Sequence, residues 1–325
     1  MQMKPHVIYD DIYLNWILGA GDGSHPTNPI RAKLAHDLLK AEFGDQLVTV
    51  KPNPAVMREH DLAALTEFHD PEYVAETLRG NNPQWYGTRP AVAEAGFAMF
   101  QGTIRALELI QSGEAKVVFN PQGAKHHARY GYGSGFCIFN DMAYAAVELQ
   151  KSGLRPLYID WDIHAGDGVH HMLANKQIPT ISIHNGSGYP MDRELQSLDG
   201  TRREIVDEEE LNYNFNVLDG DGDEVFMDAI DRAREIVEAY KPDVILLAAG
   251  ADGHEGPNNL GANNNYTSVG FRYAAEMVAE QAAKHSQGRV LIGGAGGYQP
   301  LRETPETWAL VVSTIAKWSD PTRTL

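Results

Sequence analysis

The stretch LYIDWDIHAGDG, residues 157–168, decides what fold the rest of the chain must build. Its residues alternate as in a strand, and the alternation places Asp160, Asp162 and His164 on the same face. Unpaired carboxylates are costly to bury, so these acids must be paired, hydrogen-bonded or bound to a metal. The sequence Gly-Asp-Gly ends the strand, and a helix is expected from Val169. Open α/β folds place their chemistry at such strand-to-helix junctions.

Short apolar strands and helices of 3.6-residue periodicity alternate over the rest of the chain. The run 244–249, VILLAA, is continuously apolar, as expected of a central parallel strand. The sequence has no internal repeat and no linker rich in Pro or Ser, so we predict one α/β domain over residues 1–325, with a mainly parallel sheet. Strands are expected at 6–9, 48–50, 117–119, from 157, and at 180–184, 212–218, 244–249 and 290–294. Helices are expected at 30–43, 62–68, from Pro71 with Asp70 as its cap, and at 91–112, 140–151, 224–240, 268–285 and 306–318.

The composition narrows the class of protein. With 27 basic and 44 acidic residues the net charge is −17, which argues against a nucleic-acid or anionic-membrane partner. No apolar run approaches the ~20 residues of a membrane span, and the N-terminus lacks the apolar segment of a signal peptide, so a cytoplasmic enzyme is expected. The single cysteine, Cys137, excludes an internal disulfide and is expected to be a small buried residue. An oligomer is compatible with these numbers.

Four of the expected strands run directly into unusual polar sequence. In a parallel sheet their carboxyl ends meet in one crevice. Asp162, His164 and Asp252 would then form a site of two carboxylates and one imidazole, which suits a catalytic zinc ion with an open position. The pair His126-His127 would supply acid–base capacity. The hydroxyl of Tyr298, after two glycines, could stabilise an oxyanion.

These residues belong to blocks that resemble the histone deacetylase family of metal-dependent amidohydrolases, which includes acetoin-utilisation proteins and acetylpolyamine amidohydrolases. The resemblance implies a three-layer α/β/α fold with the active site at the carboxyl ends of the strands. The matching blocks are HPTNPIRA at 25–32, HDPEYV at 69–74, GAKHHARYGYGSGFCIFND at 123–141, YIDWDIHAGDGV at 158–169, ISIH at 181–184, AAGADGH at 248–254 and GGAGGY at 293–298.

Carried over position by position, the resemblance implies a role for each polar residue. His127 would be the general base and later the acid, with His126 assisting electrostatically, while Asp160 would hold His126 and Asp167 would hold His127. Tyr298 would donate to the scissile carbonyl oxygen. The remaining implied roles are metal binding by Asp162, His164 and Asp252, lining of the substrate channel by Gly135 and Phe136, and an acetate exit channel at Arg31.

The resemblance also implies two ions. The catalytic metal would be Zn²⁺, with Fe²⁺ as an alternative. A structural K⁺ would bind the main-chain oxygens of Asp160, Asp162 and His164, together with Ser182.

Two departures bear on the reaction. Two-manganese ureohydrolases of the same fold need further aspartates where this chain has Gly166 and His254, so a one-metal amidohydrolase is favoured. The segment before Pro90 lacks the aspartate with which eukaryotic members of the family bind a peptide backbone. The same segment is also too short to hold the long insertion that acetylpolyamine amidohydrolases carry there. The predicted substrate is an acyl-lysine of proteins or peptides, or a lysine-like small amine. Acetylpolyamine deacetylation, and acyl-ligand binding without turnover, remain the alternatives.

Several other residues have plainer interpretations. We expect His170 and His171 to be solvated or packed, His184 to anchor a loop and His254 to lie at the pocket rim. Glu94 is expected on a helix surface. Trp85, Tyr86 and Tyr132 could line the pocket rim or anchor loops.

Overall fold

The computed structural model describes residues 4–19, 25–53, 55–256, 260 and 263–318. Within these residues, all strands belong to one nine-stranded sheet of order β2-β1-β3-β9-β8-β4-β5-β7-β6, in which only the β6–β7 pair is antiparallel. The strands are β1 His6–Ile8, β2 Val48–Val50, β3 Val117–Asn120, β4 Pro156–Asp160, β5 Thr180–Asn185, β6 Glu204–Asp207, β7 Asn212–Val217, β8 Val244–Ala248 and β9 Val290–Gly293.

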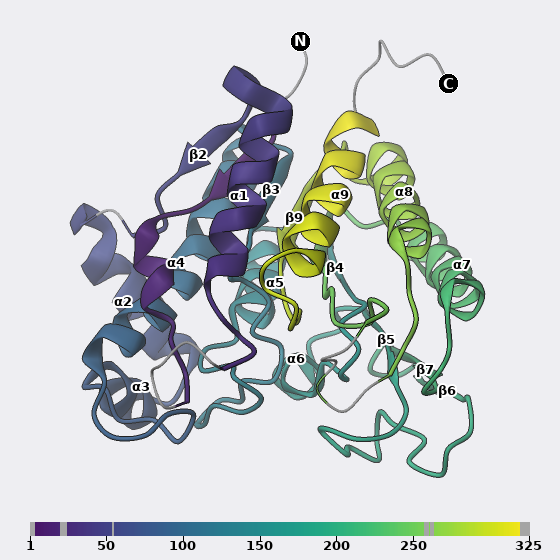
Figure 1. Ribbon diagram of the computed structural model, residues 1–325, viewed down its shortest axis with the longest axis horizontal. Coiled ribbons are helices and arrows are strands. Elements are labelled where there is room, and N and C mark those ends of the chain that lie inside the picture. The colour runs from purple at the N-terminus through teal and green to yellow at the C-terminus, as the bar shows by residue number, and fades with distance from the viewer. Residues whose placement is uncertain (1–3, 20–24, 54, 257–259, 261–262, 319–325) are drawn as a thin grey trace.

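Helices cover both faces of this sheet, which confirms the three-layer α/β/α fold. The layer of α1, α9, α8 and α7 lies side by side across the front of the molecule in Figure 1, and α4 and α5 pack on the opposite face. The α-helices are α1 Ile30–Phe43, α2 Arg58–Phe68, α3 Pro71–Leu78, α4 Pro90–Ser112, α5 Asp141–Lys151, α6 Asp167–Leu173, α7 Asp223–Tyr240, α8 Ser268–His285 and α9 Glu303–Trp318, with short 3-10 helices at Asp11–Asn15, Gly44–Gln46 and Ala55–Met57. No helix in the described ranges is both long and apolar enough to cross a membrane.

The four strands that lead into polar sequence are neighbours at the centre of the sheet. Their last residues also share one row, because Asn120 pairs with Gly293, Gly293 with Ala248, and Ala248 with Asp160. The row continues to Ser182 on β5. The loops that leave these strands therefore start at the same level of the sheet, and their side chains reach a common space.

The sequence alternates from Leu157 to His164, but strand β4 ends four residues earlier, at Asp160. Strand β4 ends at Asp160, whose Oδ1 accepts a hydrogen bond from the main-chain N–H of Asp162 at 2.9 Å. This turn bends the chain, so Asp162 and His164 lie beyond the strand and not on one of its faces. Both faces of β4 are buried, as in other parallel strands.

The other differences from prediction lie at the edges of elements. Strand β6 was not predicted, because residues 204–207 are mostly exposed and carry only Ile205 and Val206 as apolar residues. Helix α2 begins at Arg58, four residues earlier than expected, and α9 begins at Glu303. The helix at Pro71 begins as predicted, with Asp70 Oδ1 accepting from the N–H groups of Glu72 and Tyr73.

A buried ion pair joins α2 to α4. Asp61 is fully buried and accepts from Arg105 Nη2 at 2.6 Å and from Gln101 Nε2 at 2.7 Å. We predict that Asp61→Ala lowers the free energy of unfolding by about 3–5 kcal/mol, because it removes the buried partner of Arg105 and leaves that guanidinium paired only with the exposed Glu108. The double variant Asp61→Leu/Arg105→Leu should recover most of this loss. Denaturant unfolding followed by circular dichroism measures both, and a single-variant loss under about 1 kcal/mol would contradict the assignment.

Candidate active site

Asp162, His164 and Asp252 come together at the carboxyl ends of β4 and β8. Their possible ligand atoms all lie within 4.8 Å of one another, and all three side chains are buried. His164 Nδ1 lies 3.1 Å from Asp162 Oδ1 and 3.0 Å from Asp252 Oδ2. The structure thus brings together the three residues that the sequence predicts as metal ligands.

Backbone groups fix the orientation of this cluster. Gly296 N–H donates to Asp162 Oδ2 at 2.6 Å, and Ile163 N–H donates to Asp252 Oδ1 at 3.1 Å. On the far side of the imidazole ring, His164 Nε2 lies 3.0 Å from the carbonyl oxygen of Leu260. A proton on Nε2 satisfies that carbonyl and leaves Nδ1 as the ligand atom that faces the carboxylates. A Cβ at Gly296 would collide with both carboxylates, so this approach requires glycine.

The cluster fits a divalent cation. Among the described residues, no Lys or Arg forms an ion pair with Asp162 or Asp252, and their ion-pair partners are His126 and His164. Burial and the nearby Asp162 raise the pKa of Asp252 above its ordinary value. Two buried carboxylates that share one imidazole carry excess negative charge, which a bound cation would neutralise. Nitrogen and oxygen donors of this kind are typical of zinc and iron sites.

His126 and His127 lie beside the cluster, and each is held by its own carboxylate. His126 Nδ1 lies 2.8 Å from Asp160 Oδ2, and His127 Nδ1 lies 2.6 Å from Asp167 Oδ1. Both pairings follow the prediction. The two rings are 4.0 Å apart between centroids, so charge on one affects the other.

The two histidines differ in their environment. Burial opposes the charged form of His126, but the carboxylates of Asp160 and Asp162 raise its pKa to about 9. Burial lowers the pKa of His127 to about 4, and the nearby His126 adds to this effect. At neutral pH the pair therefore has one cation, His126, and one neutral imidazole, His127, which can accept a proton.

A narrow cavity connects these groups. Tyr298 is buried and lines it together with His126 and His127, and burial raises the pKa of its phenol well above the ordinary value, so the hydroxyl stays a donor. The predicted channel residues Gly135 and Phe136 line the same cavity, as does Arg31, whose Nη1 donates to the carbonyl of Gly297. The remaining lining residues are Trp16, Thr27, Ala124, Lys125, His126, His127, Cys137, Asp162, Ala295 and Gly296.

Similarity to known proteins extends over most of the chain. The sequence pattern of the histone deacetylase domain matches residues 25–315. The chain belongs to the histone deacetylase family. It is 32% identical over 311 residues to the acetoin utilization protein AcuC of Bacillus subtilis. The aligned region covers 88% of this chain and 76% of AcuC. It is 30% identical to histone deacetylase 1 of Oryza sativa and 27% identical to histone deacetylase 1 of Homo sapiens, over 92% of this chain in each case but only 57% and 62% of those proteins.

The structure adds residues around the family motifs that the sequence did not single out. Tyr158 Oη donates to Asp160 Oδ2 at 2.6 Å, and Arg129 Nη2 donates to Asp167 Oδ2 at 2.6 Å. The tyrosine could have been found, because it lies two residues before Asp160 and so on the same face of the strand. Arg129 is 38 positions from Asp167, and no local pattern indicates that contact.

Asp141 is a third such residue. Its carboxylate accepts from the main-chain N–H groups of Ala124 and Lys125 at 2.9 and 2.7 Å and from Thr103 Oγ1 at 2.6 Å. These bonds hold the segment that carries the histidine pair against α4 and the start of α5. The carboxylate therefore positions the pair without lining the cavity.

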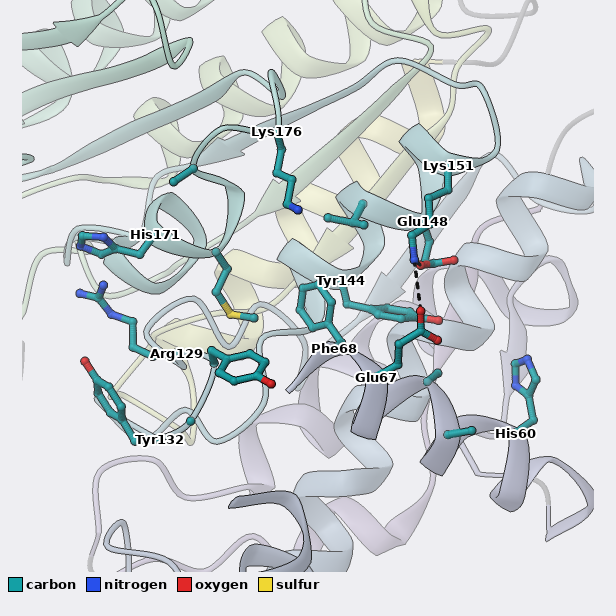
Figure 2. A pocket seen from close by; sticks show the side chains of 17 residues that line it. His60, Glu67, Phe68, Arg129, Tyr132, Tyr144, Glu148, Lys151, His171 and Lys176 are labelled. Atoms are coloured by element: carbon teal, nitrogen blue, oxygen red, sulfur yellow. Dashed lines mark hydrogen bonds and ion pairs between the residues drawn. The ribbon is translucent and has the colours of Figure 1, made fainter. Parts of the chain in front are cut away.

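Arg129 also lines a second, larger cavity outside the metal cluster. It has a volume of about 910 Å³ and is drawn in Figure 2, where Arg129 lies near His171 and Tyr132, away from Glu67 and Lys151. Among these residues, Lys151 pairs with Glu148 at 2.7 Å. The guanidinium of Arg129 thus lies between this surface cavity and the Asp167–His127 pair.

The residues with plainer interpretations mostly lie as expected. His184 is buried between Ser182 Oγ and the carbonyl of Leu195, and Cys137 is buried, with burial raising the pKa of its thiol to about 12. Glu94 forms a surface ion pair with Arg58. Trp85 is a buried loop anchor that donates to the Gly80 carbonyl, and Tyr86 is exposed. Tyr132 lines the larger cavity, and the ring of His254 stacks on that of Phe271. His170 and His171 are partly exposed beside Glu194.

We predict that Asp160→Asn reduces turnover by about 10- to 100-fold while the metal stays bound. Asparagine keeps an oxygen that can accept from Asp162 N–H, so the ligand loop keeps its shape, but the charge that holds His126 protonated is lost. Metal content by mass spectrometry and initial rates measure the two effects. Asp37→Asn on exposed α1 is the control, and full activity of Asp160→Asn would contradict the role of Asp160.

Proposed function

We propose that this chain is a metal-dependent amidohydrolase that removes acetyl or a related acyl group from a primary amine. The observation that carries this proposal is one cavity lined together by Asp162 of the cation-binding cluster, by neutral His127 and by protonated Tyr298. An amide carbonyl needs an electrophile on its oxygen, a base for the attacking water and an acid for the leaving amine. Family membership and the similarity to histone deacetylases support the same reaction.

In this proposal Asp162, His164 and Asp252 hold the metal, which when bound supplies Lewis acidity toward the carbonyl and lowers the pKa of water. His127 is neutral, so it accepts the proton of the attacking water through Nε2 while Asp167 holds Nδ1–H. Tyr298 donates to the carbonyl oxygen as negative charge develops there. His126 remains cationic and stabilises that charge, and His127 returns its proton to the leaving amine.

We also propose which ions the chain binds and where it acts. Zn²⁺ suits the donor set best, and Fe²⁺ is the alternative. Ser182 lies beside Asp160 in the sheet, which supports a K⁺ site formed with the main-chain oxygens of Asp160, Asp162 and His164. We further propose one catalytic domain over residues 1–325 that acts in the cytoplasm on acylated amines and binds neither nucleic acid nor membranes.

Two classes of substrate amine are candidates. Gly135 and Phe136 line the cavity, and the family resemblance implies that they form the channel for the acylated side chain, so acyl-lysine is the first candidate. The chain spans only 57% and 62% of the rice and human relatives, so their protein substrates are not carried over. Acetylpolyamine hydrolysis is the second candidate, favoured by the acidic charge of the chain, −17, which attracts cationic amines.

A substrate panel tests the proposal. Metal-loaded protein is given an acetyl-lysine peptide, a longer acyl-lysine peptide and an acetylpolyamine, and free amine is measured. We expect turnover of at least one class, with Tyr298→Phe slower by about 10²–10³-fold because it loses one oxyanion donor, and His127→Ala slower by at least about 10²-fold. Absence of turnover on all three substrates by metal-loaded protein would favour a family member that binds acyl ligands without hydrolysis.

A further inference from the structure

A second group of possible metal ligands lies where helix α6 faces the loop between β5 and β6. His170, His171 and Glu194 each place one ligand atom within 4.8 Å of the other two. The two histidines lie in the last turn of α6, and Glu194 lies in the loop at 186–203. All three side chains are open to solvent in part, so an ion can reach them without passing through the catalytic cavity.

The ring of His171 is oriented like that of a histidine that binds a metal. Its Nε2 lies 3.0 Å from Asp192 Oδ2, so a proton on Nε2 satisfies that carboxylate and leaves the lone pair on Nδ1. Histidines that bind metals commonly donate their second ring N–H to a carboxylate in this way. Asp192 is itself fixed, because its Oδ1 accepts from Glu194 N–H at 3.0 Å and its main-chain N–H donates to Gln196 Oε1 at 2.8 Å.

The gap between His170 and Glu194 suits a bridging ion. His170 Nε2 lies 3.7 Å from Glu194 Oε2, which is too far for a hydrogen bond. Two ligand atoms at this separation subtend about 120° at a metal about 2.1 Å from each, which is near the tetrahedral angle. The Glu194 side chain is 71% exposed and, within the described residues, pairs with no lysine or arginine, so it is able to close on the ion.

The loop that carries Glu194 also contacts the catalytic histidines. Its Tyr189 ring packs against the ring of His127 with the centroids 4.9 Å apart, and Tyr189 Oη lies 2.5 Å from Ser134 Oγ. Helix α6 contacts the same histidine from its other end, because it begins at Asp167, which holds His127 Nδ1. An ion bound between the loop and α6 would therefore restrain two segments that surround His127.

We propose that His170, His171 and Glu194 bind a second divalent ion, which ties the loop at 186–203 to α6. Two imidazole nitrogens and one carboxylate oxygen suit Zn²⁺ and similar transition metals, whereas Mg²⁺ and Ca²⁺ prefer oxygen ligands. Water completes the coordination on the open side. An ion on His170 Nε2 leaves the proton on Nδ1, which the Asn212 amide beside it accepts by turning its oxygen toward the ring. Because the group is exposed, the site fills only when the ion is added to the solution, unlike the buried catalytic cluster.

Titration with Zn²⁺ followed by calorimetry tests the site without turnover. Asp252→Ala removes a ligand of the catalytic cluster, so this variant reports on the second site alone. We expect it to bind one equivalent of Zn²⁺, and to bind about 10- to 100-fold more weakly when Glu194→Gln is added, because one ligand is lost. Glu208→Gln, at another exposed glutamate, is the matched control. Chelated wild type should take up two equivalents and Glu194→Gln one at the same Zn²⁺ concentration. No binding by Asp252→Ala, or equal binding with and without Glu194→Gln, would overturn the proposal, whereas loss of only the tighter wild-type equivalent would count against the catalytic cluster.

Proteolysis tests whether the ion holds the loop. Arg193 is exposed between Asp192 and Glu194, so trypsin can cut the loop after it. We expect Zn²⁺ to slow this cut about tenfold in wild type, because cleavage requires local opening that the bound ion opposes. Mg²⁺ should have no effect, and Zn²⁺ should have none in Glu194→Gln. Cleavage after Arg302, which is 74% exposed, reports any effect of Zn²⁺ on trypsin itself. Zinc binding that leaves cleavage after Arg193 unchanged would overturn the proposed restraint of the loop.

Discussion

Three buried carboxylates, those of Asp160, Asp162 and Asp252, stand together at the carboxyl end of the central strands, and their charge must be compensated for the chain to fold around them. The fold supplies part of the compensation: backbone N–H groups, the Tyr158 hydroxyl and the rings of His126 and His164. A cation bound by Asp162, His164 and Asp252 would compensate the remaining charge. The negative charge of these carboxylates therefore accounts both for the hydrogen bonds that hold the loops in place and for the proposed binding of a cation.

The two adjacent histidines, His126 and His127, have different carboxylate partners. Asp160 and Asp162 act on His126, whereas His127 faces Asp167, whose second oxygen is bound by Arg129. The carboxylate of Asp167, which is shared with a guanidinium, stabilises a histidine cation less than that of Asp160, whose ion-pair partner among the described residues is His126 alone. Two adjacent residues of the same type thus acquire different protonation states from their surroundings, as acid–base chemistry at one pH requires.

Much of this could be predicted from the sequence, because strand order along the chain and the polar residues after each strand are local features. The predicted site residues all follow apolar strands, and a parallel sheet brings the carboxyl ends of its strands together. These residues are Asp162, His164, Asp252, the histidine pair and Tyr298. The alternation of apolar residues could not predict the turn at Asp160. The strand ends where the Asp160 side chain accepts from Asp162 N–H, although the apolar pattern continues beyond it. Arg129 was missed because its role depends on a contact with Asp167, which lies 38 positions away in the chain.

We propose that a metal ion completes the Asp162–His164–Asp252 cluster. The most direct test is the metal content of protein purified without added metal, together with its unfolding temperature before and after chelation, for wild type and Asp252→Ala. The account predicts about one equivalent of zinc or iron per wild-type chain, a fall in unfolding temperature on chelation, and neither property in Asp252→Ala. Wild-type protein that holds no divalent metal after exposure to it, and unfolds at the same temperature with chelator, would contradict the account.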